Sequence, residues 1–205
     1  MIAAMEGDAP ITQVYMPPRT AVLRLAEAGL VRGLDAVRLD ALRAECWDDD
    51  EEQMEEAGVL GILTSFYAGV DRGVRDGFLW HDDRFWLETG DVVAEIAGTL
   101  RDDRPLFRQL EAREKVSTVR RFRETVHELE LERDDGVHKT VEARGLDDVI
   151  ACFNEELRAR GRPKRIIPLD TSGEWKMYIA GELRLLRKLA AEGALPVPTL
   201  ECLRD

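Results

Sequence analysis

The sequence predicts an α+β protein in which a helical N-terminal half packs with a four-stranded, mostly antiparallel sheet. Apolar residues recur at helical spacing through much of the first half of the 205-residue chain. The second half contains two pairs of short alternating segments, each pair joined by a glycine-containing turn and followed by a helical pattern. We expect this ββαββα order to place both helices on one face of the sheet, around an apolar core.

Residues 1–115 are expected to form a mainly helical, acidic subdomain. Thr20 is a candidate N-cap for a first helix, and a second helix is predicted over residues 34–47. An acidic run begins at Asp48, and carboxylates are favourable at a helix start. The apolar residues of 59–70 recur at helical spacing, which predicts a buried helix there.

Two aromatic segments, Gly77–Trp80 and Phe85–Leu87, flank a short polar segment. This arrangement predicts a hairpin near residues 77–88. A helix is expected after Thr89, and Pro105 suits the first turn of a further helix.

Residues 116–205 are expected to form an α+β subdomain. Its predicted strands alternate apolar and polar residues, and the strongest helix pattern of the chain begins at Leu146, with apolar residues at i, i+3, i+4 and i+7. The strands are predicted near 126–132, 137–143, 165–170 and 174–180, and the helices near 146–160 and 182–192.

The register of both hairpins follows from keeping one face of the sheet apolar. In the first, a three-residue loop pairs Leu129 with Val141, whereas a two-residue Asp-Gly loop would place Leu129 opposite Glu142. In the second, a three-residue loop pairs Ile167 with Met177. We prefer the registers that give continuous apolar faces.

The sequence of the second predicted turn, Leu169–Gly173, is similar to the active-site motif of aspartic proteases. That motif requires glycine two positions after the aspartate, but Gly173 lies three positions after Asp170. A protease would also need a second carboxylate beside the first. Asp and Gly are common turn residues, so we interpret the segment as a turn.

The net charge of -12 is unevenly distributed. Residues 1–105 hold 22 acids and 10 bases, whereas residues 106–205 hold 19 of each. The excess of negative charge therefore falls in the first half. Such a field repels nucleic acid and attracts basic surfaces, although acidic surface also serves solubility.

The sequence contains no segment typical of membrane proteins or secreted proteins. The longest apolar run, residues 59–70, is shorter than the roughly 20 residues that a spanning helix needs. The first residues carry acids and no basic segment. Cys46, Cys152 and Cys202 are far apart and form no Cys-x-x-Cys pair, which argues against a disulfide scaffold. These features predict a cytoplasmic protein.

Motifs for common cofactors and nucleophiles are missing from the sequence. There is no Gly-x-Gly-x-x-Gly loop, no phosphate-binding Gly-x₄-Gly-Lys-Ser/Thr loop and no Gly-x-Ser-x-Gly turn. We therefore name no catalytic residue and expect no metal and no cofactor.

Two groups of residues have the chemistry of metal ligands, but solvated side chains are the preferred interpretation of both. The first group is in a predicted loop, and the second is on the outer face of the first hairpin, where His138 is expected opposite Glu132. The groups are His81, Asp82 and Asp83, and His138 with Glu130, Glu132 and Glu142.

The acidic run and nearby tryptophans form the candidate partner-binding site. Carboxylates speed the approach of a basic protein, and tryptophan is enriched among the residues that contribute most affinity at interfaces. The site residues are Trp47, Asp48, Asp49, Asp50, Glu51, Glu52, Trp80 and Trp86.

A basic run near the end of the helix predicted at 146–160 is the alternative site. Such side chains contact phosphates, but cations are also favourable at a helix C-terminus. No aromatic residues are interleaved with the run, and the overall charge opposes nucleic acid. The run consists of Arg158, Arg160, Arg162, Lys164 and Arg165.

We expect a non-enzymatic protein-binding module with a basic protein partner. The strand order and acid excess resemble secretion chaperones and immunity proteins in general architecture, and an inhibitor fits the same description. Two alternatives remain open: a nucleic-acid-associated protein that uses the basic run, and a hydrolase or transferase with a site between the two halves. The sequence does not predict the oligomeric state.

Overall fold

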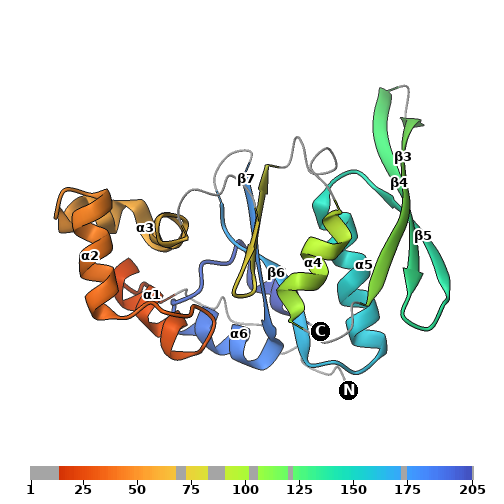
Figure 1. Cartoon of the computed structure of the whole chain (residues 1–205). Coiled ribbons are helices and arrows are strands. Elements are labelled where there is room, and N and C mark those ends of the chain that lie inside the picture. The colour runs from red at the N-terminus through yellow and green to blue at the C-terminus, as the bar shows by residue number, and fades with distance from the viewer. Residues whose placement is uncertain are drawn as a thin grey trace, which may run out of the picture.

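A computed structural model of the chain describes residues 14–67, 73–82, 91–101, 106–119, 122–171 and 175–204. The protein is α+β, with two antiparallel sheets (Figure 1). Among the described residues, no helix is both long and apolar enough to cross a bilayer.

The larger sheet lies in the middle of the molecule and has the strand order β1-β2-β7-β6 (Figure 1). Its neighbours are antiparallel throughout. The strands are β1 (Gly73–Arg75), β2 (Phe78–Asp82), β7 (Trp175–Glu182) and β6 (Lys164–Pro168).

One face of this sheet packs against the helices at the left of Figure 1. Side chains that alternate along the strands, such as Phe78, Ile167 and Ile179, join the helices in a first core. The helices of this core are α1 (Pro18–Glu27), α2 (Ala36–Cys46), α3 (Glu51–Phe66) and α6 (Leu183–Ala191), followed by the short 3₁₀ helix η1 (Leu200–Leu203).

The opposite face, which includes Leu79, Ile166 and Tyr178, contributes to a second core. Two helices, α4 (Val92–Leu100) and α5 (Leu146–Ala159), lie between this face and the smaller sheet (Figure 1). The smaller sheet has the order β3 (Phe107–Val119), β4 (Phe122–Arg133) and β5 (His138–Ala143). The molecule therefore alternates helix and sheet layers.

The predicted single sheet is wrong. The two hairpins exist, but β4 and β5 belong to one sheet, whereas β6 and β7 belong to the other. Strand β2 pairs with β7, and β3 pairs with β4, so each hairpin extends its sheet with a strand from earlier in the chain. The alternation of apolar and polar residues identifies the apolar face of a strand, but it does not identify the strand that pairs with it.

The register of the first hairpin is confirmed: Leu129 is opposite Val141, and Glu132 is opposite His138. In the second hairpin, Ile167 pairs with Ile179 and not with Met177. The error is two residues, so each side chain still points to the expected face. Strand β6 ends at Pro168 and β7 begins at Trp175.

The predicted location of both later helices on one face is also wrong. α6 packs in the first core and α5 in the second, on opposite faces of the β6–β7 hairpin. Both faces of this hairpin are apolar, since Ile166 and Ile167 are each about 1% exposed. A strand buried on both faces accepts a helix on either side.

One further prediction in the middle of the chain is wrong: the segment after Pro105 is strand β3 and not a helix. The first segment of the hairpin predicted near 77–88 lies in β2, which forms a hairpin with the preceding strand β1 through the turn Asp76–Gly77. Both residues of this turn have positive φ, which suits the twist of a tight hairpin. Residues 83–90, including Phe85 and Trp86, lie outside the described residues.

Candidate functional site

Helix α3 begins with a well-formed acidic cap. The Asp50 carboxylate accepts hydrogen bonds from the backbone N–H groups of Glu52 (2.8 Å) and Gln53 (3.2 Å). Glu51 and Glu52 occupy the first turn, where the helix dipole favours negative charge. This local chemistry holds the acidic run in helical form.

Gly58 divides α3 into two parts. Its φ of 70° and ψ of 179° are not helical, and this region of backbone conformation is essentially restricted to glycine. The part before Gly58 carries the acids, whereas the part after it packs Ile62 and Leu63 into the first core. The kink therefore sets the direction of the acidic part relative to the core.

Replacing Gly58 by alanine is expected to lower the free energy of unfolding by about 2 kcal/mol, because the alanine Cβ disfavours this backbone conformation. The Cβ itself would meet no atom within 4 Å, so the loss reports backbone strain and not crowding. Urea denaturation measures the change. Gly136→Ala is the control. Gly136 is a turn glycine with φ of 81° and similarly open surroundings, so its replacement measures the cost of alanine at an ordinary glycine of positive φ. An unchanged stability for Gly58→Ala would contradict the prediction.

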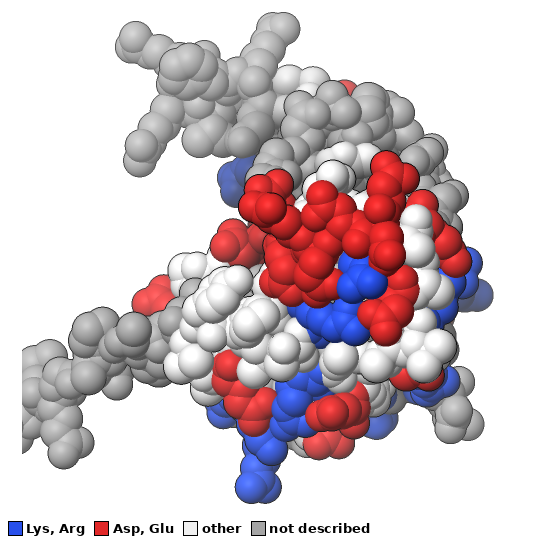
Figure 2. Space-filling view, turned by 90° about the vertical axis from the view of Figure 1, so that its left-hand side faces the viewer, with Lys and Arg blue, Asp and Glu red and all other residues white. Residues whose placement is uncertain are grey.

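Exposed acids gather on the outer side of α2, the following turn and the first part of α3 (Figure 2). We call this group the acidic surface. Within residues 35–56 there are ten acids and two arginines. The exposed members of the acidic surface are Asp40, Glu45, Asp48, Asp49, Glu51, Glu52 and Glu56.

Three arginines neutralise part of the acidic surface. Within α2, Arg38 contacts Glu45 (2.8 Å). Arg43 contacts Asp49 (2.7 Å) and Glu51 (2.5 Å), and Arg19 from α1 contacts Asp40 (2.7 Å). The hydrogen bonds to Glu51 and then to Asp49 raise the pKa of Arg43 above its ordinary value. These contacts tie α1, α2 and α3 together.

Asp48, Glu52 and Glu56 differ from these paired acids. All three are exposed, and none of them has an ion pair with another residue in the described part of the chain. Asp48 has a φ of 49°, a left-handed conformation that aspartate tolerates better than most residues. These carboxylates face solvent without a neighbouring cation in the described part of the chain.

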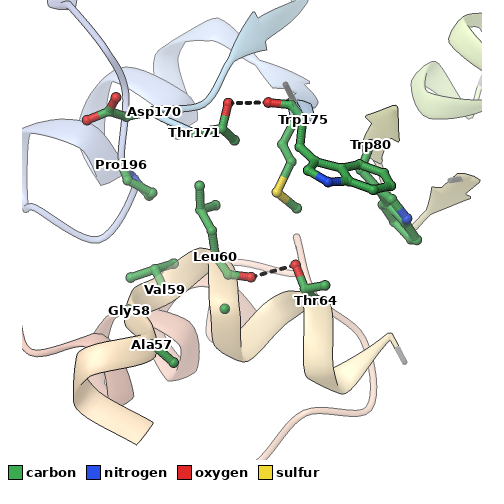
Figure 3. Close-up of a pocket in the computed structure, with 12 residues that line it drawn as sticks. Ala57, Gly58, Val59, Leu60, Thr64, Trp80, Asp170, Thr171, Trp175 and Pro196 are labelled. Carbon is green, nitrogen blue, oxygen red and sulfur yellow. Dashed lines mark hydrogen bonds between the residues drawn. The ribbon is translucent and has the colours of Figure 1, made fainter. Parts of the chain in front are cut away.

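An apolar groove of about 610 Å³ begins where the acidic surface ends (Figure 3). One wall is the stretch of α3 from Ala57 to Thr64, and the other consists of the β6–β7 loop and Pro196. Figure 3 shows Leu60 and Val59 facing Asp170 and Pro196 across the groove. Its remaining lining residues are Thr171, Trp80, Trp175 and Met177.

The Trp80 ring in the groove is held by a chain of contacts. It stacks on Tyr67, with the ring centroids 5.8 Å apart and the planes 17° from parallel. The Tyr67 hydroxyl donates to Asp76 (2.9 Å), and Asp76 also accepts from the Arg101 guanidinium (3.1 Å) and the Arg32 N–H (3.0 Å).

These contacts shift the pKa values of both groups. Burial and then the bond to Asp76 raise the pKa of Tyr67, so its hydroxyl keeps its proton and remains a donor. Burial by itself would raise the pKa of Asp76, but the hydrogen bonds from Arg32, Tyr67 and Arg101 lower it below its ordinary value. The carboxylate therefore stays charged and keeps its three donors.

The predicted partner-binding tryptophans lie in different places. Trp47 is half-buried against the first core, Trp80 is 6% exposed and lines the groove, and Trp86 lies outside the described residues. Trp175, which is 43% exposed at the groove, is absent from the predicted site. Its position two residues after the predicted turn was the available signal.

The basic run is largely engaged in internal contacts. Arg160 binds Asp134 and Glu156, the Lys164 ammonium donates to the Leu100 carbonyl, and the buried Arg165 donates to the Arg162 carbonyl. Arg158 and Arg162 keep exposed side chains. The basic run therefore presents a smaller positive surface than its number of basic residues suggests.

The histidine groups are separated by the fold. His81 is in strand β2 and 1% exposed, and not in a loop as predicted, while Asp83 lies outside the described residues. Asp82 is the last residue of the same strand.

On the outer hairpin face, Glu130 is opposite Thr140, and Glu142 is opposite Glu128. Lys115 contacts both Glu128 and Glu142, and Arg108 contacts Glu132. In the ranges that the structure describes, no cluster of three or more His, Cys, Asp or Glu residues is arranged to hold a metal ion.

Comparison with known proteins identifies no relative of this chain. No protein-family model matches it, no curated protein is similar to it, and no solved structure matches its fold.

Proposed function

We propose that the protein is a non-enzymatic binding module that recognises a basic protein partner through its acidic surface. An immunity protein, an inhibitor and a secretion-type chaperone all act by binding another protein in this way. The observation that carries the proposal is the group formed by Asp48, Glu52 and Glu56, three exposed carboxylates without ion pairs among the described residues.

These three carboxylates without ion pairs are concentrated in one part of the surface. Acids that serve solubility alone can be scattered, whereas these three lie within nine residues, next to an apolar groove. Complementary charge steers the approach of a partner and fixes its orientation. The neighbouring arginines, Arg19 and Arg43, hold the helices in place and leave these three acids unneutralised.

The test is neutralisation of the three carboxylates in one variant, Asp48→Asn, Glu52→Gln and Glu56→Gln. Asparagine keeps the tolerance for positive φ that position 48 requires. With a synthetic lysine/serine peptide as the basic probe, we expect the affinity to fall about tenfold, since each exposed contact is worth roughly 0.5 kcal/mol. Fluorescence anisotropy of the labelled peptide measures this affinity.

A control variant carries the same change of net charge elsewhere. Glu114→Gln, Glu155→Gln and Glu201→Gln neutralise exposed acids on β3, α5 and η1. We expect this variant to keep most of the affinity of the unmodified protein. An equal loss in both variants would mean that the peptide senses only net charge, and the proposal would then be wrong.

A further inference from the structure

We infer that the groove beside α3 binds the apolar side chains of an amphipathic, basic segment of the partner, and that the acidic surface binds the cations of the same segment. This inference rests on the proposed function, because the groove by itself does not select a basic ligand. It adds the chemical class of the ligand: a segment with one apolar and one cationic face.

The floor of the groove is suited to apolar side chains. Leu60 and Val59 from α3 line the groove together with the sheet residues Trp80 and Met177, and Trp175 is its more exposed aromatic residue. A volume of about 610 Å³ falls within the range of small-ligand sites, roughly 300–1,000 Å³, so it accommodates several apolar side chains. Aromatic residues in such a pocket commonly contribute most of the affinity.

The rims of the groove carry carboxylates. Glu56 directly precedes the lining residue Ala57, and Asp170 lies on the opposite wall, also exposed and without an ion pair among the described residues. An apolar ligand without charge would leave both carboxylates without a counter-ion. An amphipathic segment instead places its apolar face in the groove and extends lysine or arginine toward both rims.

The groove is also ordered before a ligand arrives. Tyr67 stacks on Trp80 and is itself hydrogen-bonded to Asp76, so the aromatic end of the groove is held by the turn between β1 and β2. On α3, the Thr64 hydroxyl donates to the Leu60 carbonyl (2.8 Å). A preformed site loses less conformational entropy on binding.

The experiment uses two synthetic peptides of equal length and equal lysine content, one leucine/lysine and one serine/lysine, both in the order of an amphipathic helix. We expect the full chain to bind the leucine/lysine peptide about tenfold more tightly, as measured by anisotropy at physiological salt. Thr64→Arg places a cation in the groove at an exposed position, and Trp175→Ala removes the aromatic rim. Either change is expected to abolish the preference for leucine.

Thr140→Arg is the matched control, because it adds the same charge at an exposed threonine on β5, in the other sheet. It is expected to keep the tenfold preference. If the preference survives Thr64→Arg as well, the peptide binds elsewhere and the inference is wrong. Analytical ultracentrifugation tests for a second copy of the chain in the groove. If the protein dimerises and Thr64→Arg abolishes the dimer, the groove binds a second copy and the inference is also wrong.

The failure of this inference is distinguishable from that of the proposed function. If the two peptides bind equally well and neutralising Asp48, Glu52 and Glu56 still weakens binding, the groove is not a binding site but the proposed role of the acidic surface stands. If neutralising the three acids does not weaken peptide binding, both the inference and the proposed function are wrong.

Discussion

Replacing Asp76 by alanine is expected to lower the free energy of unfolding by about 4 kcal/mol. The carboxylate, 17% exposed, accepts from Arg32, Tyr67 and Arg101. Hydrogen bonds to charged groups contribute roughly 1.5–3 kcal/mol each, and partial solvent exposure lowers the sum of these three to about 3 kcal/mol. Its loss leaves the half-buried Tyr67 hydroxyl without its acceptor. The φ of 58° at this position adds roughly 1 kcal/mol of strain for alanine. Urea denaturation measures the change.

Asp76→Asn separates the charge from the geometry. Asparagine tolerates the positive φ and keeps an acceptor oxygen, so we expect about half the loss of the alanine variant. Because Tyr67 holds Trp80, the alanine variant should also change tryptophan emission in the folded state. Alanine and asparagine variants as stable as the unmodified protein would show that this network does not support the fold.

Acid is expected to reduce the contribution of Asp76. Its pKa in the folded protein lies below the ordinary value, so its stabilising effect is fully present above the unfolded pKa of about 3.9 and is lost as pH falls through the folded pKa. The difference in stability between the unmodified protein and Asp76→Asn should therefore be constant near neutral pH and shrink in acid. A difference that grows as the pH falls would contradict this sign.

Replacing Arg160 by alanine is expected to lower the free energy of unfolding by about 3 kcal/mol. The guanidinium contacts both oxygens of Asp134 (2.8 and 2.6 Å) and one oxygen of Glu156 (2.6 Å), which is 8% exposed. Without Arg160, the ion pair that Glu156 keeps among the described residues is the one with Arg133, at 3.6 Å. Leaving a buried carboxylate poorly paired costs several kcal/mol, and the partial exposure of this cluster lowers that figure.

Arg158→Ala is the matched control for Arg160→Ala. Arg158 is exposed on the last turn of the same helix, and among the described residues it has no ion pair. We expect its replacement to change stability by less than about 0.5 kcal/mol. Equal effects of the two replacements would mean that the cluster around Arg160 is not structural and would restore the basic run as a candidate surface.

The candidate site could be predicted only in part. The acidic run was visible because like charges adjacent in sequence remain neighbours in any local structure. The groove was not visible, because its walls come from α3, β2, the β6–β7 hairpin and the segment near Pro196, which are far apart in sequence. Trp175 illustrates the difference. The sequence shows that this residue is aromatic, but its exposure depends on which segments pack against the end of the β6–β7 hairpin.

The sequence by itself determined several local elements of this protein, although it did not identify β3 as a strand. The apolar spacing from Leu146 predicts helix α5, and the alternation around Asp134–Gly136 predicts the register of β4 and β5, because both depend on contacts within a few residues. The tertiary structure alone decided that β2 pairs with β7 and that α5 and α6 lie on opposite faces. Strand edges offer the same backbone donors and acceptors to any partner, so the choice among partners depends on how the whole chain buries its apolar faces.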